Sequence, residues 1–167
     1  MTSTIKVDTI QTAAGGVPTV GDLGFASGSV VKVTRIQTTS ETSNSTQNYV
    51  TVWEPSYTPV LSNSKIIFAW TLKWICTHGS GAEKRYFYRV NIGGSEVFAN
   101  QYTGLYTYTG DGNWNKTDNA SSIEYTNTNG SAITLQFQGK NVDSASILVF
   151  NEDAGDIGVL TVIETVS

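Results

Sequence analysis

The clearest pattern in the chain is the alternation of large apolar residues with mostly smaller or polar ones over residues 65–74. Lys65, Thr71 and Lys73 occupy odd positions there. A period of two over ten residues places the apolar set on one face of a β-strand and is incompatible with a helix. The same alternation recurs over residues 85–92 and 132–138. We predict three strands that close one core. The large apolar residues of the first run are Ile66, Phe68, Trp70, Leu72 and Trp74.

Turn-rich segments separate further strand-like runs as far as the end of the chain. The expected strands cover residues 29–36, 47–53, 65–74, 85–92, 96–99, 122–125, 132–138, 146–150 and 157–166. Gly93 and Gly94 predict a two-residue hairpin turn, and Asn129 with Gly130 predicts a second hairpin. Short strands at this spacing are typical of an all-β antiparallel sandwich or a barrel.

The first 25 residues differ from this body. Residues 4–10 alternate and are rich in β-branched side chains, so they favour an extended strand whose apolar contacts would come from Ile5, Val7 and Ile10. A lone strand has no core of its own, and its partner is therefore expected to be another chain. We assign residues 1–25 to an attachment arm and linker, and residues 26–167 to one β domain.

Composition narrows the function classes. Only 14% of residues are charged and the formal net charge is -4, which argues against nucleic-acid binding because phosphate neutralisation needs clustered basic residues. Lys84, Arg85 and Arg89 form the one basic cluster and are interpreted as part of a solvated strand face. The single Cys76 excludes an intrachain disulfide. No signal peptide or membrane span is visible, so we expect synthesis in a cytosol and no membrane insertion.

The sequence carries no convincing catalytic or metal site. His78 lies two residues from Cys76, but no third group orients the pair. Residues 111–115 begin like a calcium loop, yet Lys116 stands where the sharp turn needs glycine. Carboxylates for glycoside hydrolysis could be drawn from several positions without any spacing to support them. We expect no enzyme activity, no metal and no cofactor.

Residues 101–120 form the longest stretch without a period, and we expect an irregular loop there. Its aromatic residues are interleaved with Asn, Gln and Asp, a mixture suited to sugar rings or protein epitopes. An alternative is that the aromatic rings merely cover the rim of the sandwich. The candidate receptor or ligand residues are Tyr102, Tyr106, Tyr108 and Trp114.

The chain resembles tailed-phage virion fibre and knob proteins, notably those of phages that infect cyanobacteria and marine bacteria. The resemblance rests on residues 3–11, on Gly15-Gly16 and Asp22-Leu23, and on three segments of the body, 29–33, 61–67 and 158–164. It implies a homotrimeric, jelly-roll-like knob, topologically similar to the C1q and tumour-necrosis-factor heads. No catalytic residue comes with this family.

These observations predict a virion-surface structural protein made in the host cytoplasm. Its expected partners are two further copies of itself, other virion proteins bound through the arm, and a host-surface glycan or protein. The preferred role is a tail-fibre-like knob for host recognition. Two alternatives stay open: a capsid decoration (cement) protein, and, from another class, a carbohydrate-binding module or glycan hydrolase.

Overall fold

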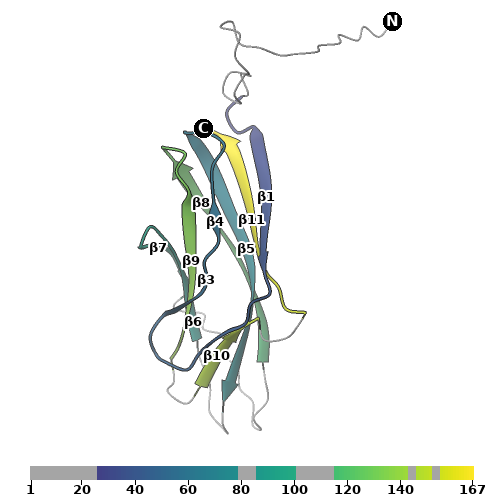
Figure 1. The fold of residues 1–167 in the computed structure, drawn as a ribbon, viewed down its shortest axis with the longest axis vertical. Helices are drawn as coiled ribbons and strands as arrows, with labels where there is room; N and C mark the ends of the chain where they lie inside the picture. The colour runs from purple at the N-terminus through teal and green to yellow at the C-terminus, as the bar shows by residue number, and fades with distance from the viewer. Residues whose placement is uncertain (1–25, 79–85, 101–114, 143–145, 152–154) are drawn as a thin grey trace, which may run out of the picture.

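The computed structural model describes residues 26–78, 86–100, 115–142, 146–151 and 155–167 (Figure 1). These residues form eleven strands joined by turns, and none forms an apolar helix of membrane-spanning length. The expected arm, 1–25, lies outside the described residues. The strands are β1 (Val30–Thr38), β2 (Thr42–Asn44), β3 (Val50–Trp53), β4 (Ser56–Tyr57), β5 (Ser64–His78), β6 (Tyr86–Ile92), β7 (Ser95–Asn100), β8 (Asn115–Asn127), β9 (Ile133–Asn141), β10 (Ser146–Phe150) and β11 (Gly158–Val166).

Two antiparallel sheets pack face to face (Figure 1). The first sheet has the order β1-β11-β5-β10-β2, and β8 pairs with the other edge of β5. β11 pairs with residues 64–71 of β5 and β10 with residues 74–78, so the two lie end to end along one edge. The second sheet has the order β3-β9-β6-β7, with β4 beside β9. The predicted antiparallel β-sandwich is confirmed.

The connectivity is that of a jelly roll. β1 with β2, β3 with β4, and β10 with β11 each act as one interrupted strand. The chain then crosses between the sheets at every connection except the β6–β7 hairpin. Counted in this way, the described residues form eight strands. The first (β1 with β2) pairs with the eighth (β10 with β11), the second (β3 with β4) with the seventh (β9), the third (β5) with the sixth (β8), and the fourth (β6) with the fifth (β7). This arrangement is a long hairpin wound into two sheets.

Alternation builds the core as the sequence predicts. The five even-numbered apolar residues of β5 are at most 2% exposed, and Ile133, Leu135 and Phe137 face them from β9. Trp74 is the centre of an aromatic cluster, with its ring 5.8 Å from Tyr86, 5.9 Å from Tyr88 and 5.2 Å from Phe150 between centroids. Gly139 of β9 leaves room for this indole, because an added Cβ would lie 2.8 Å from it.

The structure corrects the prediction for residues 115–120, which were expected to belong to an irregular loop. β8 begins at Asn115 and pairs with β5 without a register shift as far as Asn127. The sequence of its first half shows no apolar alternation, and at Asn119 the contact is polar. Asn119 donates a hydrogen bond to the Tyr86 hydroxyl at 2.8 Å.

Three smaller features of the fold can also be compared with the sequence predictions. β2 and β4 were not predicted, since one is three residues long and the other lies beside Pro55. The predicted hairpin at Gly130 is wrong. Gly130 does have a φ of 69°, but the turn joins β8 in the first sheet to β9 in the second. Gly93 and Gly94, with φ of 58° and 82°, confirm the two-residue hairpin between β6 and β7.

Candidate functional site

The sandwich has two ends of different character. At the end that we call proximal, the Gly28 N–H donates to the Val166 carbonyl and the Val166 N–H donates to Ser29, both at 2.9 Å. At the opposite, distal end, β7 ends at Asn100 and β8 begins at Asn115. The 15 residues of β5 run from one end to the other, a span of about 45 Å (Figure 1).

The sequence-predicted sites attach to these opposite ends. Tyr102, Tyr106, Tyr108 and Trp114 lie outside the described residues, but the strand ends that flank them are at the distal end. Ile5, Val7 and Ile10 also lie outside the described residues, and the chain enters the domain from them at the proximal end. The described residues that adjoin these two segments therefore lie at opposite ends of the sandwich.

A buried carboxylate organises the proximal end. Glu164 of β11 is 0% exposed, and it accepts hydrogen bonds from the Tyr57 hydroxyl at 2.6 Å and from the Val60 N–H at 2.8 Å on Oε2. Its Oε1 accepts from the Leu61 N–H at 3.0 Å. Sequence reasoning missed this residue. The sequence did contain a signal, because Glu164 continues the alternate positions occupied by the inward-facing Leu160 and Val162.

The environment of Glu164 favours its ionised form. Burial opposes ionisation, but hydrogen bonds from Tyr57, Val60, Leu61 and Ser64 outweigh it and hold the pKa of Glu164 below its ordinary value. Burial and the same hydrogen bond raise the pKa of Tyr57 well above its usual range. This end of the fold is thus fixed by a charge that ties β11 to the segment between β4 and β5.

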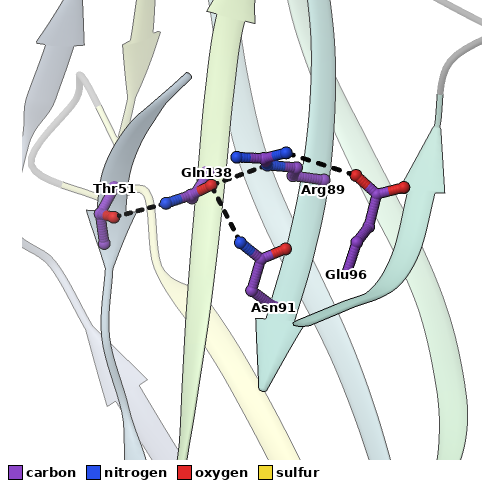
Figure 2. A network of polar contacts seen from close by, with 5 residues as sticks. All are labelled: Thr51, Arg89, Asn91, Glu96 and Gln138. Atoms are coloured by element: carbon purple, nitrogen blue, oxygen red, sulfur yellow. Dashed lines mark hydrogen bonds and ion pairs between the residues drawn. The ribbon is translucent and has the colours of Figure 1, made fainter. Parts of the chain in front are cut away.

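The outer face of the second sheet carries a row of polar side chains that crosses four strands (Figure 2). Gln138 of β9 is central. Its Oε1 accepts from Arg89 Nε at 2.7 Å and from Asn91 Nδ2 at 3.3 Å. Its Nε2 donates to the Thr51 hydroxyl at 3.0 Å, while an Arg89 Nη1 lies 3.5 Å from a Glu96 oxygen. Each link joins neighbouring strands, so the row fastens the sheet from outside.

Aromatic rings extend this face, but their surfaces are occupied. The Arg89 guanidinium lies 4.1 Å from the centroid of Tyr49, and Lys140 Nζ lies 4.7 Å from the same ring. Burial raises the pKa of Tyr49, while the Arg89 charge acts in the opposite direction. Cations over the ring leave less of it for stacking on a sugar. Arg89 lies on a strand face, as interpreted from the sequence, and Tyr86 and Tyr88 point into the core. Lys84 and Arg85 lie outside the described residues.

The His, Cys, Asp and Glu side chains of the described residues are dispersed. No group of three or more His, Cys, Asp or Glu side chains within them could hold a metal ion. Cys76 and His78 belong to the last residues of β5, where their backbones pair with Leu148 and Ser146 of β10.

No family model and no curated protein matches the chain. Among solved structures, the infectious bursal disease virus VP2 subviral particle aligns with 85% of this chain and 38% of its own, at 16% identity and a TM-score of 0.39. Infectious bursal virus derived T=1 particles align with 84% and 40%, at 10% identity and a TM-score of 0.31. Dimeric latent PorU from Porphyromonas gingivalis aligns with 85% and 14%, at 8% identity and a TM-score of 0.34.

The chain thus spans well under two thirds of each of these neighbours. Two of the three are virus particle proteins, but similarity at this level is limited to a partial likeness of β architecture.

Proposed function

We propose that this chain is a non-enzymatic structural protein of a virion surface, a homotrimeric knob whose N-terminal arm binds other virion proteins. Its distal end, with the candidate residues Tyr102, Tyr106, Tyr108 and Trp114, binds a host-surface glycan or protein. The observation that carries the proposal is the separation of the two ends by about 45 Å. Support also comes from the sequence resemblance to phage fibre knobs.

A rigid sandwich suits this role. The proximal end, where the arm joins, is held by strand pairing between Ser29 and Val166 and by the buried Glu164 contacts. A force on the arm would therefore act on a hydrogen-bonded strand pair. At the distal end, a rigid scaffold keeps binding loops in position. A capsid decoration protein would need the same arm but no recognition at the distal end.

Adsorption of particles that carry Trp114→Ala with Tyr106→Ala tests the recognition role. We expect attachment to host cells to fall about tenfold or more, because an aromatic contact at an interface is commonly worth about 2 kcal/mol. Phe87→Ala is the matched control, an aromatic residue on the outer face of the second sheet, and should leave adsorption unchanged. If particles with the double variant adsorb as well as the parent, the result would favour the alternative role as a capsid decoration protein.

Deletion of residues 1–16 tests attachment. The arm has no core of its own, so the truncated protein should fold with an unchanged thermal transition but should not enter particles. A lost transition would show that the arm is part of the fold. Normal incorporation would show that attachment lies elsewhere.

A further inference from the structure

The outer face of the second sheet carries two cations beside aromatic rings, close to the distal end, where β6 begins and β9 ends. Lys140 of β9 pairs with Phe87 of β6, and the adjacent outward row joins Gln138 to Arg89. The Arg89 guanidinium and Lys140 Nζ both lie within 4.7 Å of the centroid of the Tyr49 ring. Lys140 Nζ also lies 5.6 Å from the centroid of Phe87. We call Tyr49, Phe87, Arg89 and Lys140 the cation–aromatic cluster.

The rings hold these cations in place but do not neutralise them, because a ring attracts a cation through its quadrupole and carries no net charge. Among the described residues, Lys140 forms no ion pair, and Arg89 forms one, with Glu96 at 3.5 Å. Lys65 and Lys73 of the first sheet, by contrast, lie 3.0 Å and 2.6 Å from carboxylate oxygens. The cluster is therefore a local positive surface on a chain with a formal net charge of -4.

The fold fixes the backbone on both sides of the cluster. Asn44 is 3% exposed, and its Nδ2 donates to the carbonyl of Asn48 at 2.8 Å and to the carbonyl of Gly139 at 3.0 Å. These two residues directly precede Tyr49 and Lys140. The guanidinium of the cluster is held by the polar row of Figure 2. Groups that are already in position lose little conformational freedom when a ligand binds.

The chemistry of the cluster fits a saccharide that carries carboxylates. The planar guanidinium of Arg89 can bind a carboxylate through two parallel hydrogen bonds, and the ammonium of Lys140 adds a second charged contact. The Tyr49 hydroxyl and the exposed amide of Asn48 supply polar partners for sugar hydroxyls. A neutral sugar gains less here, since the cations cover the ring that it would stack on. A dense polyanion is disfavoured, because the acidic remainder of the chain repels it.

We infer that the cation–aromatic cluster binds carboxylated saccharides, the chemistry of uronic-acid polymers. Arg89 and Lys140 hold the carboxylates, while Tyr49 and Asn48 bind hydroxyl groups of the sugar rings. The inference goes beyond the proposed function, because it assigns a ligand class to the face of the second sheet and not to the distal candidate residues. It also applies to the isolated chain, whatever its place in a particle.

Calorimetric titration of the full chain with a hexasaccharide of galacturonic acid, at low salt, tests the inference. We expect the parent to bind this probe and not maltohexaose, a neutral hexasaccharide. Lys140→Gln should raise the Kd about tenfold, because it removes one charge-assisted contact. Lys65→Gln is the matched control, since it changes the net charge equally but lies on the first sheet, and it should change the Kd by less than about twofold.

Further variants separate the parts of the cluster. Arg89→Lys keeps the charge but loses the planar fork, so it should also weaken binding, whereas Phe87→Ala keeps both cations and should bind like the parent. Added salt should weaken the parent more than Lys140→Gln, because screening acts on the charges that remain. Trp114→Ala with Tyr106→Ala should bind galacturonate normally. Circular dichroism establishes that each variant is folded, and if Arg89→Lys is not, Lys140→Gln decides.

The opposing outcomes are distinct. No binding by the parent, or equal losses for Lys140→Gln and Lys65→Gln, would overturn the inference. Equal affinity for hexaglutamate would assign the cluster to acidic peptides and overturn the choice of a saccharide. Loss of galacturonate binding in the Trp114→Ala and Tyr106→Ala variant, with normal binding by Lys140→Gln, would overturn this inference while the proposed recognition at the distal end stands.

Discussion

Replacement of Glu164 by Gln should destabilise the domain far more than an ordinary carboxylate substitution. The amide has the shape of the carboxylate but only one acceptor oxygen. If that oxygen keeps the bonds from Tyr57 and Val60, the new NH₂ group faces the Leu61 N–H, which is 3.0 Å from the present oxygen. The variant therefore creates one buried clash of donors and weakens two charge-assisted bonds.

The magnitude follows from these contacts. A buried donor left without an acceptor costs about 1–3 kcal/mol, and loss of charge assistance costs about 1 kcal/mol for each remaining bond. Relief from burying a charge offsets part of this cost. We expect a net loss of about 3 kcal/mol in the free energy of unfolding, or about 10 °C in Tm for a chain of this size. Denaturant unfolding with a constant m-value measures it.

Glu124→Gln is the matched control. Glu124 is an exposed partner of Lys65 across β5 and β8, and a surface pair of this kind contributes about 0–1 kcal/mol. The control should therefore stay within about 1 kcal/mol of the parent. Equal losses for the two variants would refute the assignment of a special role to the buried contacts.

The pH dependence distinguishes charge from shape. Because the pKa of Glu164 is lowered in the folded state, its contribution is complete above the unfolded pKa of about 4.3 and is lost as pH falls through the folded pKa. The stability gap between the parent and Glu164→Gln should be largest near pH 7 and should shrink below about pH 4. A gap that stays constant down to pH 3 would show that the pKa of Glu164 is not lowered in the folded state.

Three further substitutions and one control test the packing, a turn and a hydrogen bond to Glu164. Gly139→Ala should cost about 1–3 kcal/mol, because its Cβ would lie 2.7 Å from Leu148 and 2.8 Å from Trp74, while Gly155→Ala, with open space around it, should be nearly neutral. Gly94→Ala should cost about 1–2 kcal/mol through its φ of 82° alone. Tyr57→Phe should cost about 1.5–3 kcal/mol by removing one donor to Glu164. Thermal unfolding measures all of them, and a neutral Gly139→Ala would contradict the described packing around the indole.

The elements that sequence predicted best are those in which side-chain size alternates. β5, β6 and β9 each place large apolar residues on one face, and burial follows that pattern directly. The first half of β8 was not predicted because its sequence lacks apolar alternation, and Asn119 makes a polar contact there, with Tyr86. Such a contact depends on a partner 33 residues away in the chain, which no local period reveals.

The candidate sites were predictable to different degrees. Tyr102, Tyr106, Tyr108 and Trp114 follow from composition, and the fold adds only the position of the strand ends that flank them. The role of Glu164 could not be predicted without the fold, because its partners, Tyr57 in β4 and Val60 and Leu61 after it, are more than 100 residues away in the sequence.

The difference between the two ends of the sandwich gives the proposed function one orientation. An arm that binds the particle would leave the domain at the proximal end, where Ser29 pairs with Val166. The ends of β7 and β8 that flank residues 101–114 lie at the distal end. Under the proposal, the distal end is therefore the end that is turned toward the host.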